Sequence, residues 1–240
     1  MLSFRVCTRV FGGWTLAGCL GLAPQAHGAV HALLIGVGDY KESKVSDLLG
    51  PINDVALIKK VLIDRFDVPP ANIKVIRNPT HTATEQAFAD LTARVQPNDQ
   101  VYIHYSGHGS WTVAPPAAVG EVAERRGQDQ TWVVHGSRSD RREGKDAMDV
   151  LDKELALWLD PLYKLTPDVV FVSDSCHSAS ITRDDQRGVR SVDGSRQPHP
   201  LRAIIKRVPE PTAGLRIGAA RDFESAVELD PRVNGRCSSK

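Results

Sequence analysis

Residues Gln100–Ser110 have the sequence QVYIHYSGHGS, and residues Asp168–Ser178 have the sequence DVVFVSDSCHS. Each begins with a short run rich in β-branched and aromatic residues, which favours a buried strand. Each run gives way to small and polar residues that include one chemically versatile group, His108 in the first and Cys176 in the second. The carboxyl ends of parallel strands share one edge of the sheet, where sites form. If the two strands are neighbours, the imidazole and the thiol face each other across one cleft.

The rest of the chain alternates between strand and helix patterns, which is typical of an α/β domain with a mainly parallel sheet. Apolar runs predict further strands at 30–37, 73–76, 131–134 and 215–219, and apolar residues at helical spacing predict helices at 53–66, 84–95 and 149–159. Residues 109–147 are expected to be an irregular excursion around the strand at 131–134. The polar composition predicts flexible insertions near 110–147 and 182–214.

The overall composition fits a single globular domain. The chain has 240 residues, of which 41% are hydrophobic and 25% charged, and this balance excludes a disordered tail, a collagen-like repeat and a polytopic membrane protein. The formal net charge is +1, so there is no basic excess of the kind that nucleic-acid binding requires. Four cysteines are too few for a disulfide-stapled scaffold.

The amino terminus is typical of an export signal. Arg5 and Arg9 precede an apolar run at 10–23 that is too short to span a membrane, and small residues follow it. We expect cleavage after Gly28, which makes the first 28 residues a signal peptide and leaves one domain at 29–240. The protein is then expected to be exported, either periplasmic or secreted.

A second interpretation of the amino terminus involves lipid attachment. Leu16–Cys19 (LAGC) resembles a lipobox, which would make 1–18 a lipoprotein signal and anchor the protein through Cys19. The protein is expected to contact the membrane only if Cys19 is lipidated. Removal of residues 1–28 leaves Cys176 and Cys237, which could pair in an oxidising compartment, although Cys176 is better used as a free thiol.

A cysteine and a histidine at neighbouring strand ends suit nucleophilic catalysis. His108 would help to deprotonate Cys176 and would later protonate the leaving amine. The backbone N–H groups of Gly109 and Cys176 are the expected donors to the oxyanion. Glycines at 107 and 109 would let the chain turn sharply after the strand. Taken singly, the cysteine could instead be a small buried apolar side chain and the histidine a hydrogen-bonded core residue.

Together these motifs resemble the caspase-like peptidases, most of all the metacaspases and their bacterial relatives. The resemblance implies a three-layer α/β sandwich whose mainly parallel central sheet is flanked by helices. It also implies a cysteine endopeptidase that uses His108 as acid/base and Cys176 as nucleophile and acts on protein or peptide substrates after Arg or Lys. The resemblance covers about residues 31–225 and rests on LLIGVGDY at Leu33–Tyr40, GPINDV at Gly50–Val55, YSGHG at Tyr105–Gly109 and DSCHS at Asp174–Ser178.

The same resemblance implies that Asp54, Ser106 and Asp174 form the pocket for the basic side chain (the S1 pocket). Two carboxylates favour a cation and can hold a guanidinium through paired hydrogen bonds. Taken without the family, Asp54 would be a carboxylate in the first turn of the helix at 53–66, and Asp174 would bond to the backbone of a turn.

Many metacaspases need calcium, and the resemblance would place it at Asp129, Asp149 and Asp152. Lys153 stands where the family often has a second acid, and a calcium ion needs several oxygen ligands. No cofactor is therefore expected to be required, with calcium as the alternative.

The carboxyl terminus differs from the family pattern. The chain ends at Lys240, soon after 221–229, where family members normally continue with a strand and a helix, so we expect the fold to lack these last elements. A shortened end favours the alternative function, a catalytically inactive caspase-like module acting in protein–protein interaction. The presence of His108 and Cys176 favours the enzyme.

Arginines are frequent in both insertions, and a protease specific for Arg meets its own loops at high effective concentration. Self-cleavage in these insertions is therefore a hypothesis, and a solvated charged loop is the alternative. The arginines concerned are Arg125, Arg126, Arg141, Arg142, Arg183, Arg187 and Arg190.

Overall fold

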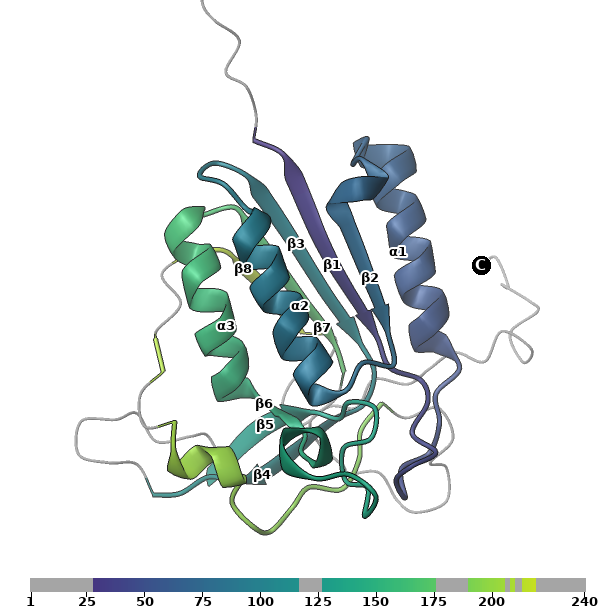
Figure 1. Cartoon of the computed structure of the whole chain (residues 1–240), viewed down its shortest axis with the longest axis vertical. Coiled ribbons are helices and arrows are strands. Elements are labelled where there is room, and N and C mark those ends of the chain that lie inside the picture. The colour runs from purple at the N-terminus through teal and green to yellow at the C-terminus, as the bar shows by residue number, and fades with distance from the viewer. Residues whose placement is uncertain (1–27, 117–126, 176–189, 206–207, 210–212, 219–240) are drawn as a thin grey trace, which may run out of the picture.

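A computed structural model describes residues 28–116, 127–175, 190–205, 208–209 and 213–218. Its centre is a five-stranded sheet of order β2-β1-β3-β7-β8, in which every neighbouring pair is parallel. All these strands point their carboxyl ends toward the same end of the molecule (Figure 1), which confirms the predicted α/β class. The strands are β1 (Val30–Gly36), β2 (Ile73–Arg77), β3 (Gln100–Ser106), β7 (Val169–Asp174) and β8 (Leu215–Gly218).

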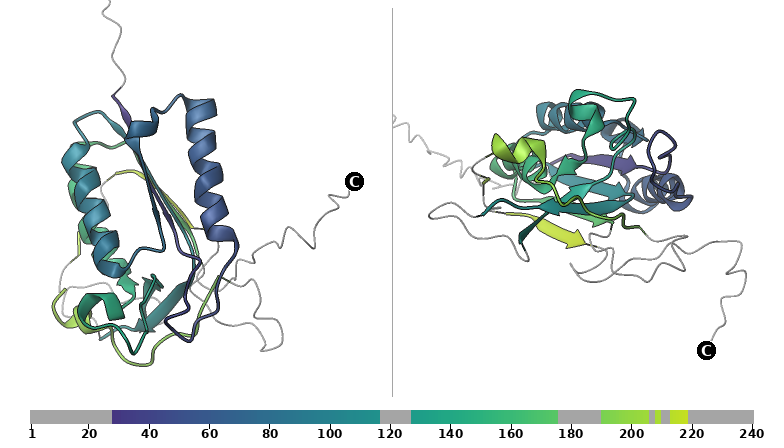
Figure 2. Two further views of the ribbon diagram at one scale, coloured as in Figure 1. Left: turned by 45° about the vertical axis from the view of Figure 1, so that its right-hand side comes forward. Right: turned by 90° about the horizontal axis from the view of Figure 1, so that it is seen from below.

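Helices cover both faces of the sheet, which gives the predicted three layers (Figure 2). The alternation of side chains along β1 explains the arrangement, because successive residues of a strand point to opposite faces. Leu33 and Ile35 join the core that includes α2 and α3, whereas Ala32 and Leu34 join the core beside α1. The helices are α1 (Gly50–Phe66), α2 (His81–Arg94) and α3 (Asp152–Leu165), with short 3-10 turns η1 (Pro70–Asn72), η3 (Gly144–Ala147) and η4 (Pro200–Ala203).

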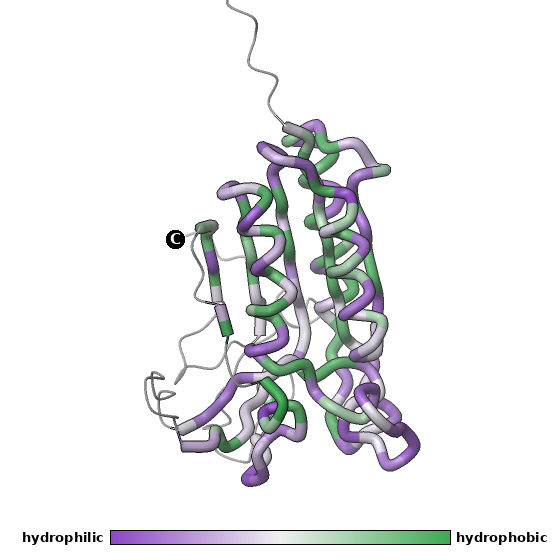
Figure 3. Tube along the Cα trace, turned by 60° about the vertical axis from the view of Figure 1, so that its left-hand side comes forward, coloured by the Kyte–Doolittle hydropathy of each residue, from purple (hydrophilic) through white to green (hydrophobic). Residues whose placement is uncertain are grey.

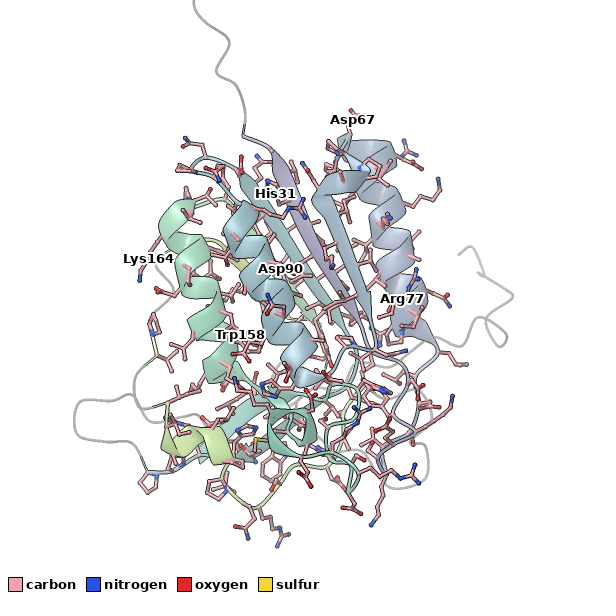
Figure 4. The ribbon with its side chains drawn as sticks, in the orientation of Figure 1. His31, Asp67, Arg77, Asp90, Trp158 and Lys164 are labelled. Carbon is pink, nitrogen blue, oxygen red and sulfur yellow. The ribbon has the colours of Figure 1, made fainter. Side chains whose placement is uncertain are left out.

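Hydrophobic residues are concentrated along the strands and on the inner sides of the helices, and hydrophilic residues along the loops (Figure 3). Trp158 of α3 lies toward α2, where its ring is 5.3 Å from that of Phe88 (Figure 4). Each of the two helices buries an apolar stripe against the sheet, as amphipathic helices in globular proteins do.

A second, antiparallel sheet of order β4-β5-β6 lies beyond the carboxyl ends of the central strands (Figure 1). Its strands are β4 (Gly109–Val113), β5 (Gln128–Trp132) and β6 (Val150–Leu151). Residues 109–147 were expected to be irregular around one strand at 131–134. This was wrong, because β4 also lies in this range and the strand near residue 131 is β5, at Gln128–Trp132. β4 escaped prediction because its buried positions, Ser110 and Thr112, are polar and give no alternation of apolar residues.

Two helices differ in extent from the predicted ranges. α1 begins at Gly50, so Asp54 lies beyond the first turn and outside the region where a carboxylate complements the helix dipole. α3 continues past Pro161, where the predicted range 149–159 had already ended, because Leu162 is fully buried against the core and holds the last turn in place.

The amino-terminal 27 residues and residues 219–240 lie outside the described part of the chain. The signal peptide, the lipidation of Cys19 and the missing last elements therefore stay predictions. Within the described ranges, no helix is long and apolar enough to cross a membrane.

Candidate active site

The two strands that carry the chemical groups are direct neighbours. β3 and β7 pair in parallel with Ser106 opposite Asp174, and the Gly107 N–H donates to the Asp174 carbonyl oxygen at 3.4 Å. His108 follows the first strand end by the same two residues by which Cys176 follows the second. Cys176 itself lies outside the described residues, but the strand that leads to it ends beside the strand that leads to His108.

Two buried tyrosines fix the backbone around His108. Its N–H donates to the Tyr40 hydroxyl at 2.9 Å, and that hydroxyl donates to the Val37 carbonyl oxygen at 3.0 Å. The Tyr105 hydroxyl donates to the His108 carbonyl oxygen at 2.8 Å. A Cβ on Gly107 would lie 2.6 Å from the Tyr105 hydroxyl and 3.0 Å from that of Tyr40. The glycine is therefore required for close packing, and its φ is not positive, in contrast to the sharp turn expected from the sequence.

The imidazole of His108 is held in one tautomer. Its Nε2 lies 2.8 Å from the Ser46 carbonyl oxygen, and because a carbonyl only accepts, Nε2 carries the proton. Nδ1 then bears the lone pair, and within the described part of the chain it has no hydrogen-bond partner. Burial lowers the pKa of His108 from 6.5 to about 4. The ring is therefore neutral near pH 7, which is the state that a general base requires.

The loop that supplies the Ser46 carbonyl is closed by its own hydrogen bonds. The Tyr40 N–H donates to Asp47 Oδ1 at 2.7 Å, and the Leu48 N–H donates to the Gly38 carbonyl oxygen at 2.9 Å. These contacts place Ser46 against the imidazole. Sequence reasoning missed Ser46 because it contributes only a backbone carbonyl, and it gave Tyr40 no role beyond the motif that contains it.

The three residues predicted to form the basic-residue pocket, Asp54, Ser106 and Asp174, lie around the guanidinium of Arg190. Ser106 Oγ donates to Asp54 Oδ2 at 2.7 Å and accepts from Arg190 Nη1 at 2.9 Å. Arg190 Nη2 donates to Asp54 Oδ2 at 2.6 Å, and Nη1 also donates to Asp174 Oδ2. We call the site formed by these three residues the acidic pocket. Its carboxylates bind a side chain from elsewhere in the fold.

Arg190 is well buried in the acidic pocket, since its side chain is only 7% exposed. Burial by itself lowers the pKa of Arg190, but the charges of Asp174 and Asp54 outweigh it, so that the pKa is raised. The electrostatic field of the pocket therefore favours a cation strongly enough to offset the loss of water around it.

The backbone of Arg190 is bound as well. Its carbonyl oxygen accepts from the Gly109 N–H at 2.9 Å, and the Val192 N–H donates to the Gly109 carbonyl oxygen at 3.0 Å. Farther along, Ser195 also bonds to β4 through both its N–H and its carbonyl. Residues 190–195, called here the docked segment, thus run parallel to β4 along its free side.

Comparison with known proteins supplies the family. The model of the Caspase domain family matches residues 29–228. The chain belongs to the caspase family. It is 33% identical over 165 residues to Metacaspase-1 of Eremothecium gossypii, an alignment that covers 65% of this chain and 33% of that protein. It is 31% identical over 160 residues to Metacaspase-6 of Arabidopsis thaliana, covering 64% of this chain and 39% of that protein.

This caspase-family chain therefore spans between about a third and two fifths of the length of these two metacaspases. Among solved structures, protein GSU0716 from Geobacter sulfurreducens is similar at a TM-score of 0.47 and 20% identity, over 68% of this chain and 57% of that one. The family recognised from the sequence is confirmed, and its special closeness to bacterial members stays a prediction.

The three acids that the resemblance had suggested for calcium are paired with basic side chains of this chain. Asp129 is fully buried, with Oδ1 3.3 Å from Lys153 Nζ and Oδ2 3.2 Å from Arg202 Nε. Asp152 lies 3.2 Å from the same lysine, and Asp149 is held by a guanidinium 2.5 Å away. Calcium needs several oxygens free to converge on it, so these residues do not fit the ion. In the described ranges, no group of three or more His, Cys, Asp or Glu side chains could hold a metal ion.

Proposed function

We propose that this caspase-family chain is a cysteine endopeptidase that cleaves peptide bonds after Arg or Lys. The observation that carries the proposal is the acidic pocket with Arg190 inside it. A site that binds one buried guanidinium through two carboxylates and a hydroxyl is suited to the basic side chain of a substrate. Membership of the caspase family supports the reaction type.

The proposed mechanism starts from a neutral imidazole. Nδ1 of His108 accepts the proton of the Cys176 thiol, and the thiolate attacks the carbonyl carbon of the scissile bond. The N–H groups of Gly109 and Cys176 donate to the oxyanion that forms. The imidazolium gives its proton to the leaving amine, which leaves a thioester on Cys176 that water hydrolyses. The low pKa of His108 suits the second proton transfer, because it makes the imidazolium a strong acid.

Substrate selection is assigned to the acidic pocket. Asp54 and Asp174 keep roughly a third of their side-chain surface exposed, so water still screens their charge in part. The planar guanidinium can bond to both carboxylates at once, whereas the ammonium of lysine presents a single compact charge. Arg is therefore the favoured side chain and Lys the second.

Fluorogenic peptide amides test the function. With reductant present, an Arg amide should be hydrolysed and a matched Asp amide should not. Cys176→Ala should lose at least about a thousandfold in kcat. Asp174→Asn should lower kcat/KM for the Arg amide by roughly 10- to 100-fold, the effect of losing a hydrogen bond between charged groups. If folded wild-type protein hydrolyses neither amide, the proposal is wrong and the inactive interaction module is favoured.

A further inference from the structure

A buried carboxylate lies at the end of the sheet opposite to the acidic pocket. Asp99 directly precedes β3, whereas Ser106 of the acidic pocket ends that strand. Asp99 is only 6% exposed. Its Oδ2 accepts from the Gln96 N–H at 2.8 Å, which closes the turn between α2 and β3, and its Oδ1 accepts from the Ala29 N–H at 2.8 Å. The proposed reaction makes no use of this carboxylate, which binds the start of the domain instead.

The charge of Asp99 has no permanent cation beside it in the described part of the chain. Its ion-pair neighbour there is His31, whose Nε2 lies 3.2 Å from Oδ2, near the amino end of β1 (Figure 4). A histidine carries a charge only when it is protonated, whereas a buried carboxylate is costly unless it is paired. A permanent positive charge at Oδ1 would therefore be favourable, and the atom that Oδ1 contacts is the backbone nitrogen of Ala29.

The nitrogen of Ala29 is positioned by the sheet. The Ala29 carbonyl oxygen accepts from the Gln100 N–H at 2.9 Å, and the next residue, Val30, pairs with Gln100 as β1 begins. These bonds are made by Ala29 and the chain that follows it. The contact between the Ala29 nitrogen and Asp99 therefore does not depend on the residue that precedes Ala29.

Gly28 lies so close to the turn before β3 that a larger residue does not fit. A Cβ at this position would lie 2.0 Å from the Asn98 carbonyl oxygen and 2.6 Å from the Cα of Asp99. An export signal also requires small residues near its cleavage point, and the sequence predicts the cut after Gly28. The predicted cut thus falls at the very nitrogen that Asp99 holds.

We propose that Asp99 is the binding site for the α-ammonium group of Ala29 in the processed protein. The proposal goes beyond the peptidase function and rests on the predicted cut after Gly28. A signal peptidase adds water across the Gly28–Ala29 bond, which leaves a carboxylate on Gly28 of the released leader and an ammonium group on Ala29. The hydrogen bond from a neutral amide to Oδ1 then becomes an ion pair, which is stronger. Removal of the leader thereby stabilises the domain.

Export and acetylation together test the proposal. The chain is exported behind its own leader, carrying Cys176→Ala so that no thiol reacts, and amino-terminal sequencing should read Ala29 first. Part of the product is then acetylated enzymatically at its α-amine, which removes the charge and keeps an N–H. Acetylation should lower Tm by roughly 2–4 °C, the shift expected in a domain of this size for the loss of one partly buried ion pair.

Two variants assign the effect to the carboxylate. In Asp99→Asn the acetylated and free forms should differ in Tm by less than about 1 °C, because the side-chain amide still accepts a hydrogen bond but carries no charge. Asp168→Asn is the matched control. Asp168 is an exposed acid at the same end of the sheet, where its carbonyl oxygen accepts from the Val101 N–H at 2.8 Å, so acetylation should lower Tm as in the Asp99 protein.

Equal Tm decreases with Asp99 and with Asp99→Asn overturn the binding site. An exported protein that begins at any residue other than Ala29, including a lipidated Cys19, overturns it as well, and the peptidase function is untouched by either result. If Asp99→Asn does not fold, the reactivity of the amine decides. Ion pairing keeps the amine protonated, so a small acylating reagent at about pH 8 should modify Ala29 at least about threefold more slowly in the folded than in the urea-unfolded protein. Equal rates overturn the proposal.

Discussion

Lowering the pH from about 7 to about 5 is expected to destabilise the fold through His108. Burial lowers the pKa of its imidazole to about 4, whereas in the unfolded chain it is about 6.5. Between these two pKa values the imidazole is mostly protonated in the unfolded chain and mostly neutral in the folded protein. The stability contributed by the neutral ring is therefore fully present above about pH 6.5 and is lost as the pH falls toward about 4.

The size of the effect follows from the two pKa values. A difference of one unit corresponds to about 1.4 kcal/mol, so a fall from 6.5 to about 4 amounts to about 3 kcal/mol, of which about 2 kcal/mol is lost by pH 5. In a domain of this size 1 kcal/mol shifts Tm by roughly 2–4 °C. His108 alone should thus lower Tm by roughly 4–8 °C over this pH range.

Thermal unfolding measured at both pH values checks this expectation. Cys176→Ala and the double variant Cys176→Ala, His108→Gln are compared, so that the Cys176 thiol cannot react during the measurement. Other titrating groups act in both proteins, so the difference between the two Tm decreases isolates His108. The glutamine should remove most of the decrease assigned to the imidazole. If Tm falls equally in both proteins, the reasoning about the buried neutral ring is refuted.

Two further expectations concern groups around the site. Tyr40→Phe leaves the buried N–H of His108 without its acceptor, which costs about 1–3 kcal/mol, and scanning calorimetry should show a lower Tm than in the control Tyr163→Phe. A Tm equal to that of the control would mean that this hydrogen bond adds nothing. Calcium or a chelator should change Arg-amide hydrolysis by less than about twofold, since Lys153 already neutralises Asp129. Activity that rises steeply with calcium would contradict this assignment.

The central sheet could be predicted because its strands are covered on both faces. β1 is almost entirely apolar, and β3 is rich in β-branched and aromatic residues; both compositions are characteristic of strands buried between helices. The placement of His108 and Asp174 at one edge then followed from the parallel rule alone. The position of a reactive side chain could thus be predicted where it stands at or just after the end of a strand.

Elements held by distant polar contacts could not be predicted in this way. β4 buries Ser110 and Thr112, and besides β5 it pairs with the docked segment, which lies far along the chain. The sequence around Arg190 likewise contains no feature that distinguishes it from the other arginines of the insertions. Its position depends on carboxylates at 54 and 174 that only the completed fold brings together.

The acidic pocket draws its three side chains from well-separated parts of the sequence: Asp54 from α1, Ser106 from the end of β3 and Asp174 from the end of β7. A growing polypeptide therefore has no binding site for arginine until β7 has been synthesised and has joined β3. Under the proposed function, an incomplete chain therefore cannot yet bind the arginine of a substrate.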